Sequence, residues 1–208
     1  MLWLAYVVWN RSAIATVCVC LSALLGDYVV AIEALSQDLR AVADNATHGI
    51  IGLLTWYIVT NKVTNMSVAS RFWEIMGCGL IASGIDLDHF AAAKSFKIEA
   101  ARQLSARPLL HCTSLVMAGC SFILLLTHVL CWPYLQRVAW ILTAAVLSHH
   151  LRDATRRGFW LYPFGSSPPV PYVGYILGCM LLPHVLPFLV CYTEITESTP
   201  SRNMVMTL

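Results

Sequence analysis

Hydrophobic residues run along this chain in long stretches, and many of its charged residues lie near the ends of those stretches. Such runs are typical of membrane helices, because about 20 helical residues cross the ~30 Å hydrocarbon core with every backbone polar group bonded internally. Six windows have this character: residues 13–32, 47–60, 72–90, 109–132, 138–151 and 170–192. The pattern predicts an all-α, polytopic integral membrane protein with about six transmembrane helices in one bundle.

The same pattern divides the chain. Residues 1–192 are expected to form the helical bundle, whereas residues 193–208 lack an apolar pattern and are expected to be a flexible, dispensable tail. The first window is longer than the ~7–15-residue apolar core of a signal peptide, so we expect a retained helix. Four prolines and a glycine exclude a continuous helix over residues 160–171, where we expect a rigid loop that could cover a site.

Composition agrees with a membrane location. The 208 residues are 58% hydrophobic and 12% charged, against roughly 45–50% apolar residues in soluble domains, so the lipid bilayer is the expected partner. The net charge of +2 provides no strong basic or acidic field, and we predict no nucleic-acid partner. The eight cysteines lie almost wholly inside apolar stretches without a Cys-x-x-Cys pair, which favours small core residues.

The distribution of lysine and arginine predicts an orientation. With six spans, the segments after the first, third and fifth helices share one side of the membrane, and they carry eight of the 13 Lys and Arg residues. By the positive-inside rule, that side faces the cytoplasm. The glycosylation sequons at Asn10 and Asn65 would then face the lumen, and glycosylation at Asn45 would indicate the inverse orientation.

Ionisable residues at the ends of the apolar windows are the main functional signal. A charged side chain at the centre of a membrane helix costs about 2.5–3.5 kcal/mol on insertion scales, so such residues tend to have a role. Because antiparallel helices alternate in direction, the ends of odd helices and the starts of even helices lie at one membrane face. That face is expected to collect Asp27, Asp44, His48, Asp86, Asp88, His89, His111, His149, His150 and Asp153.

The spacing of these residues points to metal binding. Asp44 and His48 are four residues apart, as are His149 and Asp153, so each pair places a carboxylate beside an imidazole on one helix face. Mixed nitrogen and oxygen ligands suit a divalent metal, zinc or manganese being our first choice, and several carboxylates permit two ions. The predicted ligands are His48, Asp86, Asp88, His89, His111, His149 and Asp153, with Asp44 as general base.

Other polar residues have plainer interpretations. Asp27 is interpreted as an interface residue that could pair with Arg40, and His128 and His184 lie away from the cluster. Arginines near the predicted face either bind a phosphate-containing or lipid-like substrate or anchor the protein at anionic lipid headgroups. The arginines predicted to bind substrate are Arg107, Arg152 and Arg156.

Blocks of sequence around these residues resemble a known family. They are Asp44-Asn45-Ala46-Thr47-His48, Ile85-Asp86-Leu87-Asp88-His89-Phe90, Arg107-Pro108-Leu109-Leu110-His111-Cys112, and Ser148-His149-His150-Leu151-Arg152-Asp153 through Pro163-Phe164-Gly165. In order and spacing they closely resemble the animal transmembrane protein 267 family over about residues 17–188. More distantly, they are similar to YdjM-like bacterial inner-membrane proteins, a group regarded as metal-dependent hydrolases.

The bacterial resemblance implies a hydrolase, with differences in two blocks. The bacterial Asp-x-Asp-His block matches 86–89, and its Ser-His-x-x-x-Asp block matches 148–153. Its His-Arg-Gly block reads Ala106-Arg107-Pro108 here, and its Thr-His-Ser block reads Leu110-His111-Cys112, so one potential ligand is missing. The resemblance implies a metal-dependent hydrolase, and the alternatives are a transporter or ion-binding protein and a non-catalytic structural protein.

Overall fold

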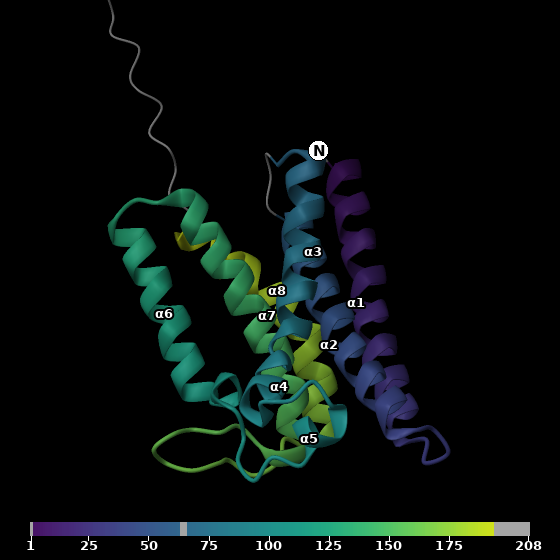
Figure 1. The fold of residues 1–208 in the computed structure, drawn as a ribbon. Coiled ribbons are helices and arrows are strands. Elements are labelled where there is room, and N and C mark those ends of the chain that lie inside the picture. The colour runs from purple at the N-terminus through teal and green to yellow at the C-terminus, as the bar shows by residue number, and fades with distance from the viewer. Residues whose placement is uncertain (1, 63–65, 194–208) are drawn as a thin grey trace, which may run out of the picture.

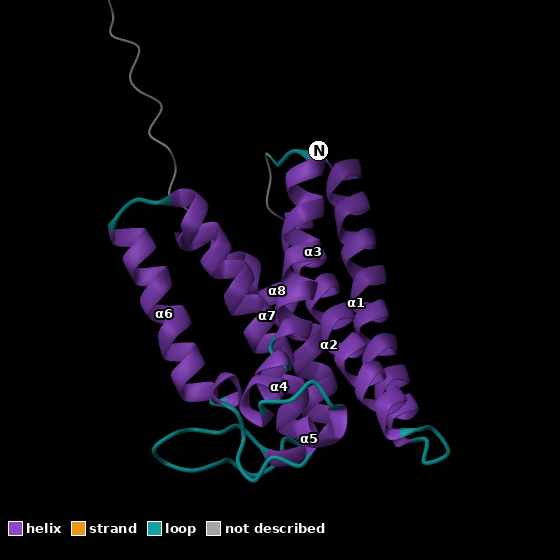
Figure 2. Ribbon diagram, in the orientation of Figure 1, coloured by secondary structure: helices purple, strands orange, loops and turns teal. Residues whose placement is uncertain are grey.

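The computed structural model describes residues 2–62 and 66–193, and this part of the chain is helical. Its long helices are α1 (Leu2–Ala31), α2 (Gln37–Lys62), α3 (Val68–Gly84), α6 (Thr113–Val129), α7 (Pro133–Arg157) and α8 (Tyr172–Thr193) (Figures 1 and 2). The shorter elements are α4 (Leu87–Ala93), α5 (Ile98–Arg102) and the 3₁₀ turn η1 (Leu109–His111). No strand occurs within the described ranges, so the predicted all-α fold is confirmed.

Each predicted window corresponds to one long helix, and successive long helices run in alternating directions (Figure 1). The third window differs in detail, because α3 ends at Gly84 and the chain starts again as α4 at Leu87. Asp86 therefore lies in the break between two helices rather than on a helix face. The fourth window opens with η1, which places His111 just before α6. Both breaks occur at the end of the molecule that carries α4 and α5, called the site end below (Figure 1).

Close helix packing fixes the site end. α2 and α3 touch through small residues, since a methyl group added at Gly79 would lie 2.9 Å from the carbonyl oxygen of Gly49. Around this contact, a buried core joins α2, α3, α7 and α8, with Trp56 and Ala144 fully buried. Gly84 has open space beside it and takes no part in this close approach.

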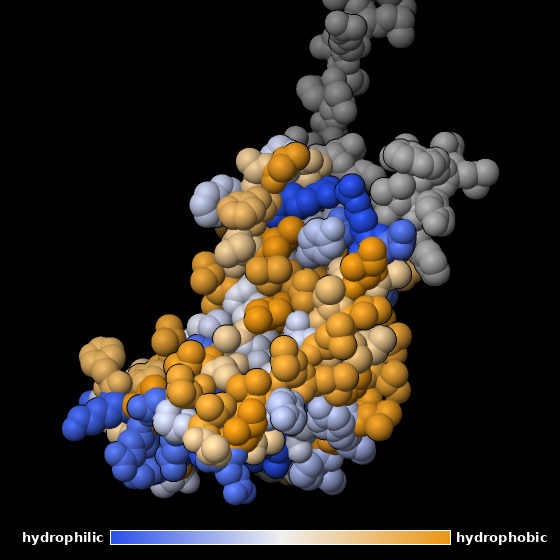
Figure 3. All heavy atoms as spheres, turned by 90° about the vertical axis from the view of Figure 1, so that its right-hand side faces the viewer, coloured by the Kyte–Doolittle hydropathy of each residue, from blue (hydrophilic) through white to orange (hydrophobic). Residues whose placement is uncertain are grey.

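Much of the outer surface is apolar. On α1, Ile14, Leu21 and Leu25 are exposed, and Figure 3 shows hydrophobic residues over the middle of one face with hydrophilic residues gathered toward its two ends. By length and composition, Asn10–Ala31 and Tyr172–Thr193 could cross a membrane, and Thr113–Val129 is a shorter apolar helix. The predicted tail lies almost wholly outside the described residues.

The loop after α7 is fixed to the start of α6. α7 ends at Arg157 and is followed by Gly158, whose φ of 68° and contact with Ser167 leave no room for a side chain. Ser114 makes two hydrogen bonds to the loop: its amide donates to the carbonyl oxygen of Trp160 (3.3 Å), and its hydroxyl donates to that of Tyr162 (2.9 Å). These bonds hold the loop against the start of α6.

Candidate metal centre

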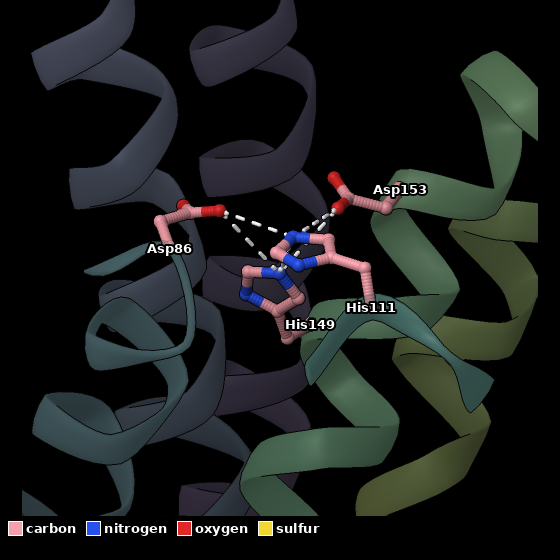
Figure 4. A group of neighbouring side chains, drawn as sticks. All are labelled: Asp86, His111, His149 and Asp153. Carbon is pink, nitrogen blue, oxygen red and sulfur yellow. Dashed lines mark hydrogen bonds and ion pairs between the residues drawn. The ribbon is translucent and has the colours of Figure 1, made fainter. Parts of the chain in front are cut away.

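Four of the predicted ligands meet at the site end. Asp86 comes from the break before α4, His111 from η1, and His149 and Asp153 from successive turns of α7 (Figure 4). One ligand atom of each residue can be chosen so that all four lie within 4.8 Å of one another. The predicted convergence of helix ends is confirmed for these residues, which we call the four-residue cluster.

The distances inside the four-residue cluster are short and similar. His111 Nε2 lies 3.3 Å from Asp86 Oδ1, 3.3 Å from Asp153 Oδ2 and 3.3 Å from His149 Nε2. His149 Nε2 lies 3.4 Å from Asp153 Oδ2 and 3.7 Å from Asp86 Oδ1. Atoms bound to one metal at ~2.0–2.2 Å are themselves about 3–4 Å apart. The spacing therefore fits one coordination shell.

The hydrogen bonds of the two histidines decide which ring nitrogens face inward as acceptors. His149 Nδ1 lies 2.8 Å from the carbonyl oxygen of Ala82, which can only accept, so this nitrogen carries the proton and Nε2 of a neutral ring has a lone pair. His111 Nδ1 lies 3.3 Å from Asp88 Oδ2, which favours the same tautomer. Two lone pairs and two carboxylates then face one another, an arrangement that a cation stabilises.

A second group adjoins the first through His111. Asp88, His89 and His111 also offer ligand atoms within 4.8 Å of one another. His89 Nδ1 and Asp88 Oδ1 are 3.1 Å apart, yet both atoms are buried and neither has a hydrogen-bond partner. The other oxygen of Asp88 accepts from the amide of Leu110 at 2.9 Å. One carboxylate oxygen of Asp88 thus orients His111, and the other carboxylate oxygen has no hydrogen-bond partner.

His48 lies outside the four-residue cluster. Its ring is 1% exposed and stacks on that of His149, with centroids 3.9 Å apart. Its Nε2 faces Asp153 Oδ1 at 3.4 Å, whereas the cluster uses the other oxygen of that carboxylate. Arg152 Nη1, which can only donate, lies 3.3 Å from the same nitrogen of His48, so that nitrogen is an acceptor. His48 therefore lies beside Asp153 without donating to it, and it does not contact the point on which the four inner atoms converge.

Asp44 and Arg152 are engaged in a network of ion pairs. The Arg152 side chain is 1% exposed, donates to Asp27 at 2.8 Å and also donates to Asp44. Arg156 donates to Asp44 at 2.7 Å, and Tyr172 donates to Asp27 at 3.1 Å. Asp27 therefore pairs with Arg152 instead of the Arg40 suggested by sequence. Two guanidinium groups reduce the basicity of Asp44, and a buried, paired Arg152 is not free to bind substrate.

The neighbouring histidine on α7 has a different environment from His149. His150 Nδ1 pairs with the hydroxyl of Thr113 at 2.8 Å, and its Nε2 lies 2.9 Å from the carbonyl oxygen of Leu110. Both ring nitrogens are thus used in hydrogen bonds. Far from the site end, His184 lies between Thr16 and Lys62, in keeping with a structural role.

A hollow of about 530 Å³ opens onto the clusters. Its wall includes Asp86, His111 and Asp153, together with arginines from three parts of the chain: Arg40, Arg102, Arg107, Arg156 and Arg157. Gly158 lines the hollow, but none of residues 160–171 does. The loop formed by these residues therefore does not cover the site as the lid that the sequence suggested. Nothing in the local sequence pattern of Arg40 or Arg102 distinguishes them as site residues, because only the tertiary fold brings them to one hollow.

The molecule is thus an all-helical protein with apolar outer faces and a histidine and aspartate cluster at one end. Comparison with known proteins shows which family this protein is similar to. The chain is 36% identical to transmembrane protein 267 of Mus musculus over 168 residues, 79% of this chain and 75% of the relative. It is 41% identical to transmembrane protein 267 of Danio rerio over 170 residues, 79% of this chain and 73% of that relative.

The chain belongs to the transmembrane protein 267 family. Like the proteins of that name, it is an integral membrane protein, as the apolar windows predict. No protein-family model matches the chain, and no solved structure does. The similarity to YdjM-like proteins and the hydrolase activity it implies stay predictions.

Proposed function

We propose that this protein is a membrane-embedded, metal-dependent hydrolase whose metal is held by Asp86, His111, His149 and Asp153. One observation carries the proposal: Nε2 of His111, Nε2 of His149 and one carboxylate oxygen each of Asp86 and Asp153 lie within 4.8 Å of one another. With the ring protons on Nδ1, as the Nδ1 contacts of both histidines favour, all four atoms are acceptors and repel one another unless a cation lies between them.

The donor chemistry suggests the metal. Two imidazole nitrogens and two carboxylate oxygens suit zinc or manganese better than magnesium or calcium, which prefer oxygen. Where a second ion is bound, Asp88 and His89 supply further ligands on the other side of His111. A bound divalent ion would lower the pKa of a water molecule and polarise the bond to be hydrolysed.

The surrounding residues have supporting roles in this proposal. Asp88 holds His111, so this ligand stays in position. With Asp44 neutralised by arginines, His89 is the group placed to accept a proton, because its ring lines the hollow beside Asp88.

The proposal includes six membrane crossings, with the site end at the cytoplasmic edge. The six long helices alternate in direction and have apolar outer faces, and polar residues are concentrated in the connections and in buried pairs. Helices α2, α3 and α7 carry more polar residues than α1 and α8, but several of those are inside the bundle, such as His48 and Arg152. A transporter would more commonly hold its ligand near the bilayer midplane.

Metal analysis of purified protein tests the site. Wild-type protein incubated with zinc and manganese should retain one of them in stoichiometric amount after desalting, measured by mass spectrometry of the metal. His149→Ala should lose most of it, whereas His150→Ala should keep it, since the nitrogens of His150 are already used. Wild-type protein without metal, or equal loss in both variants, would refute the proposed site.

Hydrolysis assays test the activity. Purified protein should release product from a panel of lipid phosphoesters, amides and esters, and metal removal or Asp153→Asn should abolish this release. Ion flux in proteoliposomes without hydrolysis would favour the transporter alternative. Metal that raises the melting temperature without any turnover across the panel would favour a structural role.

A further inference from the structure

The wall of the hollow at the site end carries more positive than negative charge, because five arginines line it against the three carboxylates of Asp44, Asp86 and Asp153. Arg156 in its wall is paired with Asp44, but Arg40, Arg102, Arg107 and Arg157 have no ion-pair partner within the described ranges. Such charge is what an anionic ligand would neutralise.

The bonds of these arginines leave their charge uncompensated. Arg107 donates to two main-chain carbonyl oxygens, at 2.7 and 3.1 Å, and Arg102 donates to the side-chain oxygen of Gln37. The Nε atom of Arg40 is buried without a partner. Burial and the neighbouring Arg157 guanidinium lower the pKa of Arg107, which is consistent with crowded positive charge.

A second, apolar hollow of about 250 Å³ lies along α7 and α8. Leu147 and Leu151 of α7 face Gly178, Leu182 and Val185 of α8 across it. The α8 residues belong to a segment apolar enough to cross a membrane, so this hollow lies at bilayer depth, whereas the first lies among the connections at the helix ends. We call it the α7/α8 groove.

The two hollows adjoin. Thr113 and His150 line both of them, and the side chains of these two residues are hydrogen bonded to each other at 2.8 Å. The Thr113 and His150 side chains thus lie where an arginine-lined hollow at the helix ends meets an apolar groove along α7 and α8. A molecule that fills both must be anionic at one end and apolar at the other.

The geometry points to an anionic phospholipid with a phosphate-bearing headgroup as the substrate, its headgroup among Arg40, Arg107 and Arg157 and one acyl chain in the α7/α8 groove. Guanidinium groups form paired hydrogen bonds with phosphate oxygens, and the apolar wall of the groove can bury the acyl chain of the lipid. The headgroup would then lie beside Asp86 and Asp153 of the four-residue cluster. Calling this lipid a substrate rests on the proposed hydrolase function, whereas its binding does not.

Binding can be measured without turnover, so its failure and that of the hydrolase proposal are distinguishable. Full-length protein in detergent is exposed to a phosphatidic acid analogue with a photoreactive group in its acyl chain, in the presence of a metal chelator. We expect cross-links within residues 147–151 and 178–185, mapped by mass spectrometry. Labelling confined to other segments of the wild-type protein would overturn the proposal, and this readout needs no variant.

Matched variants test each end of the lipid. Val185→Trp should fill the α7/α8 groove and remove most labelling, whereas Leu177→Trp, exposed on the same helix outside the groove, should not. Arg40→Gln and Arg157→Gln should each weaken binding about tenfold, with Lys97→Gln, outside the hollow, as control. If Val185→Trp and Leu177→Trp reduced labelling equally, the assignment of the acyl chain to the α7/α8 groove would be overturned.

Competing ligands distinguish the sources of the phosphate. Unlabelled phosphatidic acid should compete, while inorganic phosphate and phosphatidylcholine should compete far less. Full competition by inorganic phosphate would show that the headgroup alone is recognised and would overturn the lipid assignment. Equal competition by phosphatidylcholine would overturn the role of the unpaired arginines.

Discussion

Asp88 illustrates how one side chain serves the cluster without joining its inner four atoms. One of its oxygens lies 3.3 Å from His111 Nδ1 and also accepts from the amide of Leu110, while the other lacks a hydrogen-bond partner. A carboxylate that holds a histidine in this way fixes the tautomer and orientation of the ring. Its contribution to metal affinity is therefore expected to be smaller than that of an inner ligand, but measurable.

Asp88→Asn is expected to weaken zinc or manganese binding about 10–100-fold, because the amide no longer favours the proton on His111 Nδ1. The measurement is a competition titration of purified protein against a metal chelator. Glu99→Gln, an exposed carboxylate on α5, is the control and should leave the affinity unchanged. An affinity equal to wild type in Asp88→Asn would contradict its assigned role.

Arg152 is the other residue whose role depends on its partners. It is buried between Asp27 of α1 and Asp44 of α2, so it joins three helices beside the site. Removing one partner of a buried ion pair leaves an uncompensated charge, which typically destabilises a protein by about 3–5 kcal/mol.

Arg152→Ala is expected to lower the thermal stability of the protein in detergent strongly, because two carboxylates lose their shared partner. Arg152→Lys should recover little of the lost thermal stability, since a single ammonium group does not reproduce a guanidinium group that reaches both aspartates. Thermal unfolding followed by circular dichroism provides the measurement, with the exposed Arg157→Ala as control. An unchanged melting temperature in Arg152→Ala would show that the network does not stabilise the fold.

At the scale of elements, the contact between α2 and α3 positions the site. Ala82 of α3 provides the carbonyl that orients His149 of α7, and Asp86 follows two residues after the end of α3. α3 can take this position because Gly49 and Gly52 on α2 and Gly79 on α3 allow the backbones to approach.

Gly79→Ala is expected to lower the melting temperature and weaken metal binding together, because the new methyl group would lie 2.9 Å from the Gly49 carbonyl oxygen. Overpacking of this kind commonly costs about 1–3 kcal/mol. Gly77→Ala, on the same helix with open space beside it, is the control and should leave both properties unchanged. Equal behaviour of the two variants would mean that the α2/α3 contact has no influence on the site.

On the scale of the whole molecule, the two ends differ in character. The site end carries α4, α5 and the hollow with its arginines, while the last residues of α2, the first residues of α3 and the connection between α6 and α7 lie at the opposite end (Figure 1). Positive residues favour the cytoplasmic side of a membrane. In our proposals, the arginines of the hollow therefore have two roles: they recognise an anionic ligand, and they orient the site end toward the cytoplasm.

A membrane-impermeant thiol reagent tests this orientation in sealed microsomes, whose cytoplasmic face is outward. Ser105→Cys, at the site end, should react directly, whereas the exposed native Cys131 between α6 and α7 should react only after permeabilisation. The reverse pattern, or glycosylation of Asn45, would show that the site faces the lumen.

The all-α fold and the alternating direction of the six long helices could be predicted from the sequence because they depend on local information, whereas the short elements α4, α5 and η1 were not predicted. A long apolar window reports a helix wherever it lies in the chain, and alternating direction then places Asp86, His111, His149 and Asp153 at one end. Ion-pair partners are not local, so the Asp27 and Arg152 pair could not be inferred. Arg107 and Arg156 of the hollow were predicted near this face, whereas Arg40 and Arg102 were not predicted to belong to the site.

Only the tertiary structure decided which side chains share a centre, since this depends on the rotation of each helix and on where the chain breaks. The break after Gly84 turns Asp86 toward His111 and His149, whereas Asp44, which lies inside α2, pairs with Arg152 and Arg156. A buried guanidinium requires carboxylate partners. That requirement, which no spacing along the chain reveals, separates the ion-pair aspartates from the cluster aspartates.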